Sequence, residues 1–224
     1  LEQRAVQTKL GLEQYLAAQS ATLHLVTLDP ALQKALAAPA RLPSEAETAQ
    51  LERAWAAGSD PALTAMVLGT PPATRLRALV SVRPAFRQVQ VVDRYGRTIA
   101  ASARGGRLFH KDAGWFKLMT NPEADPEPHV GDLQQPRGSN LILFETVYPV
   151  RDRDGAWVGA VRALVDANDL YTILAPVRVG RTGHAVLLRA TDGLVLASDE
   201  SERIMKVAYP GFDSLRAAIE GFPI

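Results

Sequence analysis

One irregular segment combines the kinds of side chain that could bind a small molecule. His110, Lys111 and Asp112 precede the aromatic pair Trp115 and Phe116 there. Aromatic rings on a short helix above a sheet form an apolar wall, and one or two polar groups beneath it would orient a ligand. The pattern therefore predicts a binding pocket, with plain core packing of the two rings as the alternative.

Arg162 is a single charge in an apolar strand predicted at residues 156–165. Alternation along the strand places Ala160, Arg162 and Leu164 on one face. An inward guanidinium needs an anionic partner, because a buried unpaired charge is costly. Its planar fork could clamp a ligand carboxylate. It could also pair with an internal carboxylate, for which Asp132 is the candidate, or lie at a solvated edge.

The strand predicted at residues 141–150 supplies two further polar candidates. Thr146 and Tyr148 share one face with Phe144, and this face belongs either to the core or to the pocket. The residues expected to bind a ligand are His110, Lys111, Trp115, Phe116, Thr146, Tyr148 and Arg162.

Motifs for catalysis and metal binding are missing from the sequence. The histidines form no His-x-x-x-His pair and are far apart: His24, His110, His129 and His184. There is no Gly-x-Ser-x-Gly elbow, no Gly-x-x-x-x-Gly-Lys loop and no cysteine. Asp152, Asp154 and Gly155 resemble the start of a calcium loop, but apolar residues follow where that loop needs a glutamate, so a hairpin turn is expected. We therefore expect no catalytic residue, metal or cofactor, and no enzyme activity in this segment.

Charge and hydropathy narrow the partners further. The 224 residues include 25 Lys and Arg and 24 Asp and Glu, so the basic surface of a nucleic-acid-binding protein is not expected. No stretch approaches the roughly 18 apolar residues that a membrane-spanning helix needs. The sequence starts with the helix-like LEQRAVQTKL rather than a signal peptide, which indicates a piece of a longer protein.

The periodicity changes from helical to strand-like near Phe86. The expected helices are residues 1–28, one after each of the caps Asp29, Ser44 and Asp60, and residues 73–82, 114–119 and 166–174. The expected strands are residues 87–92, 97–101, 141–150 and 156–165. This order predicts an α+β fold with helices covering a small antiparallel sheet.

One strand–turn–strand unit occurs twice. Residues 92–102 read VDRYGRTIAAS and residues 189–198 read RATDGLVLAS. Two copies of one sheet-forming unit are expected, although such segments can also look alike by chance. Only about forty residues follow Gly183, so the second module is expected to be reduced or incomplete.

The order of these segments resembles the double Cache family. The resemblance rests on VVDxxG at 91–96, Ala-Ser at 101–102, DxxWF at 112–116, VGD at 130–132, YPVxDxDGxxVGAV at 148–161, TGHAxLL at 182–188 and Asp-Gly at 192–193. It implies a long N-terminal helix and two PAS-like antiparallel-sheet modules, the second short or truncated. The implied divisions are an N-terminal helical region (1–83), a membrane-distal module (84–175) and a membrane-proximal module (176–224).

Double Cache domains are sensory parts of histidine kinases, chemoreceptors and cyclic-dinucleotide enzymes. The resemblance therefore implies an extracytoplasmic ligand-sensing domain on the periplasmic or extracellular face of the bacterial inner membrane. Segments flanking this chain would anchor it to the membrane, and signalling chemistry would lie on the other side.

The resemblance also bears on the ligand. Amino-acid-binding members carry an arginine two residues before the Trp-aromatic pair and an aspartate on the last strand, where this sequence has Ala113 and Leu164. A small anion such as a carboxylate, held by Arg162 with His110 or Lys111, is therefore expected instead of an amino acid. The alternative is a protein-interaction or dimerisation module with a vestigial pocket.

The N-terminal helix is expected to pair with its copy in a homodimer. Four apolar residues fall close to one stripe: Leu12, Leu16, Leu23 and Val26. A parallel helix pair needs such an apolar seam.

Overall fold

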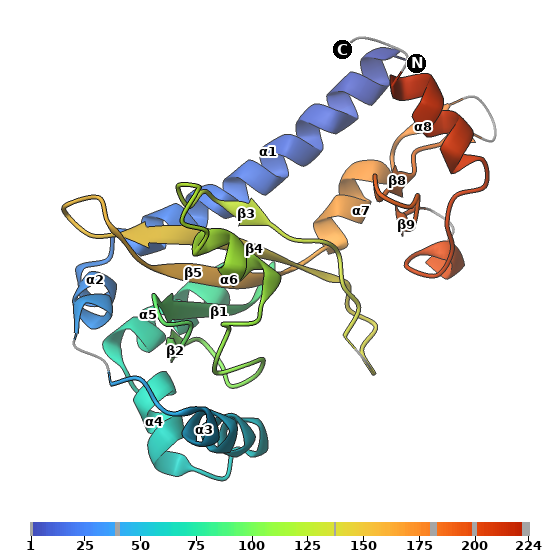
Figure 1. Cartoon of the computed structure of the whole chain (residues 1–224). Coiled ribbons are helices and arrows are strands. Elements are labelled where there is room, and N and C mark those ends of the chain that lie inside the picture. Colours follow the sequence, from blue (N-terminus) through green and yellow to red (C-terminus); the bar gives the residue numbers. More distant parts are fainter. Residues whose placement is uncertain (1, 39–40, 137, 180–182, 199–200, 221–224) are drawn as a thin grey trace. The chain divides into compact units, whose positions relative to one another are not determined.

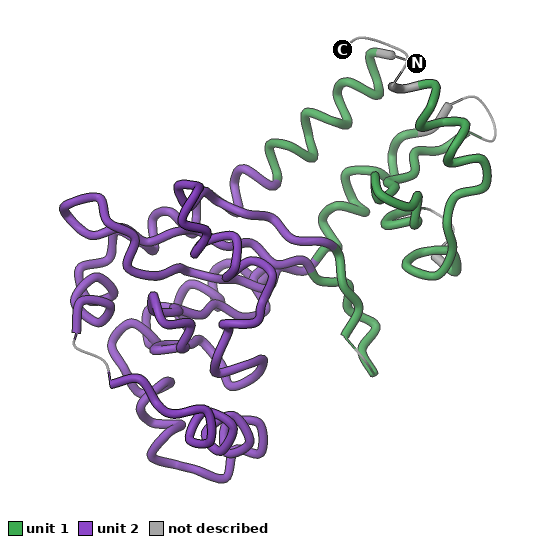
Figure 2. Tube along the Cα trace, in the orientation of Figure 1, with its two compact units in different colours: residues 1–15, 133–143, 167–224 green, residues 16–132, 144–166 purple. Residues whose placement is uncertain are grey.

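In the computed structural model, residues 2–38, 41–136, 138–179, 183–198 and 201–220 are described. The chain divides into two compact units (Figure 2). The larger, called the sheet unit, comprises residues 16–132 and 144–166. The smaller, called the end unit, comprises residues 1–15, 133–143 and 167–224. Each unit draws on more than one of the three predicted segments, whose boundaries stay a prediction.

A five-stranded sheet in the order β2-β1-β5-β4-β3 forms the centre of the sheet unit (Figure 1). The strands are β1 (Phe86–Asp93), β2 (Thr98–Ala101), β3 (His129–Val130), β4 (Leu143–Arg151) and β5 (Trp157–Asp166). β1 pairs antiparallel with β2 and β5, and β3 pairs antiparallel with β4. The predicted α+β fold is confirmed.

The pairing of β1 with β5 decides which side chains share a face. Gln90 lies opposite Arg162, and Val92 lies opposite Ala160. Because side chains alternate along strands, these four residues lie on the same face. Rings of the short helix α6 (Gly114–Met119) pack against Val92 and Ala160. This face, called the covered face, is therefore the one that α6 covers.

Local capping signals start most of the helices where the sequence predicts them. Asp29, Asp60 and Thr70 each accept a hydrogen bond from a backbone N–H of the following helix, and a proline follows each of them. Ser44 and Glu47 form a complete capping box. The helices so started are α2 (Pro30–Ala37), α4 (Pro61–Leu68), α5 (Pro71–Val82) and α3 (Glu45–Ala57).

The helix predicted from Asp166 begins two residues later. α7 (Asn168–Leu174) has Ala167 at its N-cap, which makes no side-chain hydrogen bond. Asp166 ends β5 and accepts hydrogen bonds from Arg87, from Nε at 3.0 Å and from Nη2 at 2.5 Å. Its carboxylate therefore bridges to β1.

The long N-terminal helix is confirmed, and its pairing with a second copy stays a prediction. α1 (Glu2–Thr27) is continuous. Leu23 is fully buried and the rest of the predicted stripe is half-buried, because the chain's own core uses this face. Only the half-buried residues of the stripe, Leu12, Leu16 and Val26, keep part of their surface for a second copy. The large apolar side chains that α1 exposes are Val6, Leu10 and Leu25.

The end unit contains short strands and helices around a small core. β6 (Arg178–Val179) pairs with β7 (Gly183–His184), and β8 (Leu187–Leu188) pairs with β9 (Val195–Ala197). The β8–β9 hairpin is the second copy of the predicted repeat. A 3-10 turn (Ser201–Arg203) and α8 (Phe212–Glu220) follow. In its described residues this unit forms two-stranded sheets only, which fits a reduced second module. Thr182, which belongs to the family pattern, lies outside the described residues.

Candidate ligand-binding site

An ion pair lies on the covered face of the sheet. Nε of Arg162 donates to Oε2 of Glu145 at 2.9 Å, and Nη1 donates to Oε1 of Gln90 at 3.0 Å. The side chains of Arg162 and Glu145 are 14% and 16% exposed, so both charges are largely removed from water. Of the alternatives left open for Arg162, the structure shows an inward guanidinium paired with an internal carboxylate, which is Glu145 rather than Asp132.

The guanidinium of Arg162 retains unused hydrogen-bonding capacity. It has five N–H donors, and the two bonds above account for two of them. Within the described chain, the other three donate to no protein atom. Oε1 of Glu145 likewise accepts no hydrogen bond from these residues. A bound anion could therefore contact Arg162 without breaking the bridge to Glu145.

His110 is a buried, neutral neighbour of this pair. Its side chain is 3% exposed, and its Nε2 shares a hydrogen bond of 3.1 Å with Oγ1 of Thr98. Burial, together with the positive charges of Arg162 and Arg107, lowers the pKa of His110 from 6.5 to about 3. His110 is therefore an uncharged polar group beside this ion pair.

The aromatic pair of α6, for which the sequence left a pocket wall and core packing open, is closely packed. The rings of Trp115 and Phe116 meet edge to face, with centroids 5.5 Å apart. Both are buried with Val92, Met119, Val147 and Ala160, and Trp157 packs against them. His110 lies 5.3 Å from Trp115, centroid to centroid. Core packing, the alternative for the two rings, is what the structure shows for them.

Two of the predicted residues lie on the opposite face of β4. Val147 packs with the rings of α6, so alternation turns its neighbours Thr146 and Tyr148 away from them. The ring of Tyr148 lies 4.9 Å from that of His24 on α1. Thr146 is buried, and its Oγ1 has no hydrogen-bond partner among the described residues. The structure therefore does not bring these two residues to Arg162.

Glu145 and Gln90 are the functional candidates that the sequence analysis missed. Glu145 is a charge in an apolar strand, as Arg162 is, and this could have indicated a pair. The pairing depends on β4 and β5 being neighbours. Gly131 also makes room for it, since a Cβ at Gly131 would lie 2.7 Å from Cγ of Glu145.

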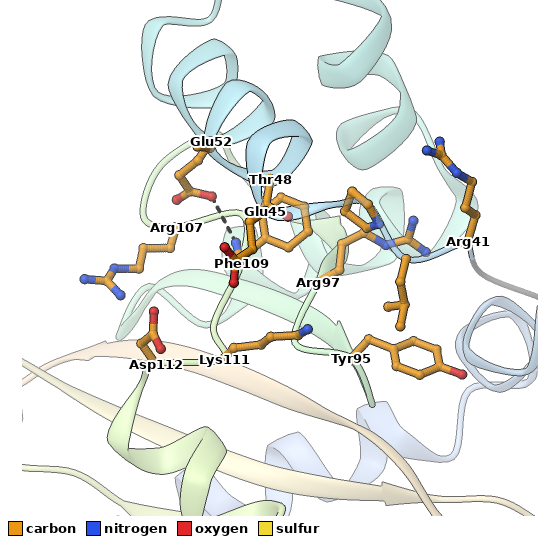
Figure 3. Close-up of a pocket in the computed structure, with 13 residues that line it drawn as sticks. Arg41, Glu45, Thr48, Glu52, Tyr95, Arg97, Arg107, Phe109, Lys111 and Asp112 are labelled. Atoms are coloured by element: carbon orange, nitrogen blue, oxygen red, sulfur yellow. Dashed lines mark hydrogen bonds between the residues drawn. The ribbon is translucent and has the colours of Figure 1, made fainter.

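Lys111 lies in a different place from the other predicted residues. It lines a cavity of about 600 Å3 in the sheet unit, between α3 and residues 95–112 (Figure 3). His110 points to the covered face, whereas its neighbour Lys111 points into this cavity. The predicted set is therefore divided: His110, Trp115, Phe116 and Arg162 meet at the covered face, and Lys111 does not join them.

The described part of the chain holds neither a three-ligand metal cluster nor a membrane-spanning helix. There, no three His, Asp or Glu side chains gather closely enough to hold a metal ion. None of the described helices combines the length and apolar character that crossing a membrane requires.

Similarity to known proteins is found in structure and not in sequence. No protein-family model and no curated protein matches the chain. The ligand-binding domain of the Pseudomonas aeruginosa amino acid chemoreceptor PctC, in complex with GABA, is 17% identical; the match has a TM-score of 0.59 and covers 97% of this chain and 80% of that one.

Two further sensor domains match nearly the whole chain. The V. cholerae histidine kinase DctB sensor domain is 14% identical with a TM-score of 0.56, covering 97% of this chain and 74% of that one. The ligand-binding domain of the Campylobacter jejuni chemoreceptor Tlp3, in complex with 4-methylisoleucine, is 11% identical with a TM-score of 0.58, covering 93% and 71%. The chain has the fold of these sensor domains. The Cache-type fold implied by the sequence is confirmed.

The bridge on the covered face should be measurable as a coupling energy. Replacing Glu145 with Ala leaves Arg162 largely buried without its anion, so the free energy of unfolding should fall by about 1–3 kcal/mol. In a double-mutant cycle with Arg162→Ala, denaturant unfolding should give a coupling of about 0.5–3 kcal/mol. The exposed ion pair of Arg151 and Asp125 is the control, and its coupling energy should be about 1 kcal/mol or less. Equal couplings for the two pairs would contradict this account.

The lowered pKa of His110 should make stability depend on pH. Between pH 6.5 and about 3 the unfolded chain binds a proton that the folded chain does not. Stability should therefore fall as the pH drops through this range, by up to about 1.4 kcal/mol per pH unit from this group. Unfolding of the wild type and of His110→Gln, measured at several pH values, should show a steeper fall for the wild type. Parallel curves of stability against pH for the two proteins would contradict the lowered pKa of His110.

Proposed function

We propose that this chain is the extracytoplasmic ligand-sensing domain of a membrane signalling receptor and performs no catalysis itself. The observation that carries the proposal is the likeness of fold, over nearly the whole chain, to sensor domains of two chemoreceptors and a histidine kinase. The parent protein would be a receptor of one of these kinds or a cyclic-dinucleotide enzyme. The domain would lie on the periplasmic or extracellular face of the inner membrane, anchored by flanking segments.

The proposed ligand is a small carboxylate bound between α6 and the covered face. Arg162 would donate its unused N–H groups to the carboxylate, because a guanidinium binds such a group through two parallel hydrogen bonds. Trp115 and Phe116 would supply the apolar wall, and His110 a neutral polar contact. Glu145 already neutralises Arg162, so the ligand would approach the guanidinium from the side away from Glu145.

A protein-interaction or dimerisation module is the second candidate function. The bridge to Glu145 and the close packing of the α6 rings favour it, because both fill the covered face without a ligand. The exposed apolar side chains of α1, Val6, Leu10 and Leu25, would then contact a second copy. A homodimer of the intact receptor is compatible with either function.

Thermal-shift screening against small carboxylates, amino acids, amines and purines tests the proposal. A ligand that binds only the folded state raises the melting temperature, and we expect a carboxylate to do so. Arg162→Ala should abolish the shift, and Arg162→Lys should reduce it because the bidentate geometry is lost. Arg153→Ala, in the exposed β4–β5 turn, is the matched control and should leave the shift unchanged.

The outcomes separate the two functions. A shift that survives Arg162→Ala would place the ligand elsewhere and contradict the proposed site. If no compound shifts the melting temperature and the chain associates through the exposed face of α1, the dimerisation module is favoured. Association should then weaken when Leu10 and Leu25 are replaced by Ser.

A further inference from the structure

The cavity beside Lys111 is a separate feature of the sheet unit. Its volume of about 600 Å3 falls within the range of small-molecule sites, roughly 300–1,000 Å3. Its walls are the loop 41–43, the first turns of α3, the β1–β2 turn and residues 107–112. Arg162 is not among the lining residues, so the cavity is distinct from the site on the covered face.

The walls of the cavity are held in place by hydrogen bonds. Glu52 of α3 accepts the backbone N–H of Leu108 at 3.0 Å and that of Phe109 at 3.1 Å, and Figure 3 shows the bond to Phe109. In the β1–β2 turn, Asp93 accepts the backbone N–H groups of Tyr95 and Arg97 at 2.9 Å. The opening is therefore a preformed space between anchored segments.

Two cationic side chains at one end of the cavity, Lys111 and Arg97, have N–H donors that bind none of the described residues. Figure 3 shows the ammonium of Lys111 directed toward Arg97 and Tyr95, whereas Arg107 points to the other side. Lys111 makes no ion pair or hydrogen bond with the described residues. Arg97 uses its Nε to bind Asp93 at 3.2 Å, and its other guanidinium N–H groups donate to none of those residues.

The acidic side chains that line the cavity do not neutralise the positive charges of Lys111 and Arg97. Glu52 is occupied by the two backbone N–H groups that it accepts. Glu45 lies in the first turn of α3, where the helix dipole stabilises a carboxylate without a cation. Figure 3 places Asp112 on the side of Arg107, away from Arg97. Lys111 and Arg97 are therefore available to an anion.

Apolar side chains border the same space. Tyr95 and Phe109 contribute aromatic rings, and Leu42 and Pro43 contribute aliphatic surface. A ligand that filled the cavity would therefore need an apolar body as well as an anionic group. A planar ring carrying a carboxylate meets both requirements.

We propose that this cavity is a second ligand site that binds a small aromatic carboxylate. The carboxylate would contact Lys111 and Arg97, and the ring would pack against Tyr95 and Phe109. Residues 107–112 form the wall between this site and the covered face, because His110 points one way and Lys111 the other. A ligand in either site would thus contact the same segment.

Titration of the 224-residue chain with benzoate, followed by NMR of the labelled protein, tests the proposal. Benzoate should shift the amide signals of residues 95–97 and 107–112. Lys111→Ala should weaken its affinity about tenfold or more, as expected for loss of a charge-assisted hydrogen bond, and Lys111→Arg should retain most of it. Lys117→Ala, an exposed lysine of α6 outside the cavity, should have no effect.

Two probes and one variant complete the test. Acetate, which lacks the ring, and benzylamine, which carries the opposite charge, should bind at least tenfold more weakly than benzoate. Arg162→Ala should leave benzoate binding unchanged, which separates this site from the one on the covered face. No benzoate binding at millimolar concentration, equal binding to Lys111→Ala, or loss of binding in Arg162→Ala alone would overturn the proposal.

Discussion

A charge on the covered face of a sheet is tolerated only when an opposite charge and hydrogen bonds lie beside it. In the sheet unit, the contacts of Arg162 with Glu145 and Gln90 meet this condition and connect strands β1, β5 and β4 through their side chains. The same cation acts on His110 and helps keep that ring neutral. The polar side chains of the covered face thus surround the guanidinium of Arg162. The rings of α6 pack against the apolar side chains of the same face.

The segment 107–112 links this arrangement to the helices. Glu52 holds the backbone of Leu108 and Phe109, while His110 reaches inward to Thr98. Leu108 packs with Trp55 in a second core cluster beneath α3 and α4. Anchors on both sides give the segment a defined position. A sensor domain needs such a connection, because binding must favour one arrangement of the protein over another to transmit a signal.

Local and periodic signals account for what the sequence could predict. Caps such as Ser44 act within one turn, and strand alternation placed Arg162 on one face with Ala160 and Leu164. Its partner could not be predicted in the same way, because Glu145 meets Arg162 only through the order of strands. The face that Tyr148 shares with Thr146 could belong to the core or to the pocket. It lies opposite the covered face because their neighbours Glu145 and Val147 occupy the covered face. The cavity beside Lys111 needs three distant segments to meet, and no local pattern encodes that meeting.

A crystal structure of the chain with a carboxylate identified by thermal shift tests the central claim most directly. The account predicts a carboxylate oxygen at about 2.7–2.9 Å from a terminal nitrogen of Arg162, beneath Trp115, with the bridge to Glu145 intact. A ligand bound elsewhere, with Arg162 contacting only Glu145 and Gln90, would contradict it.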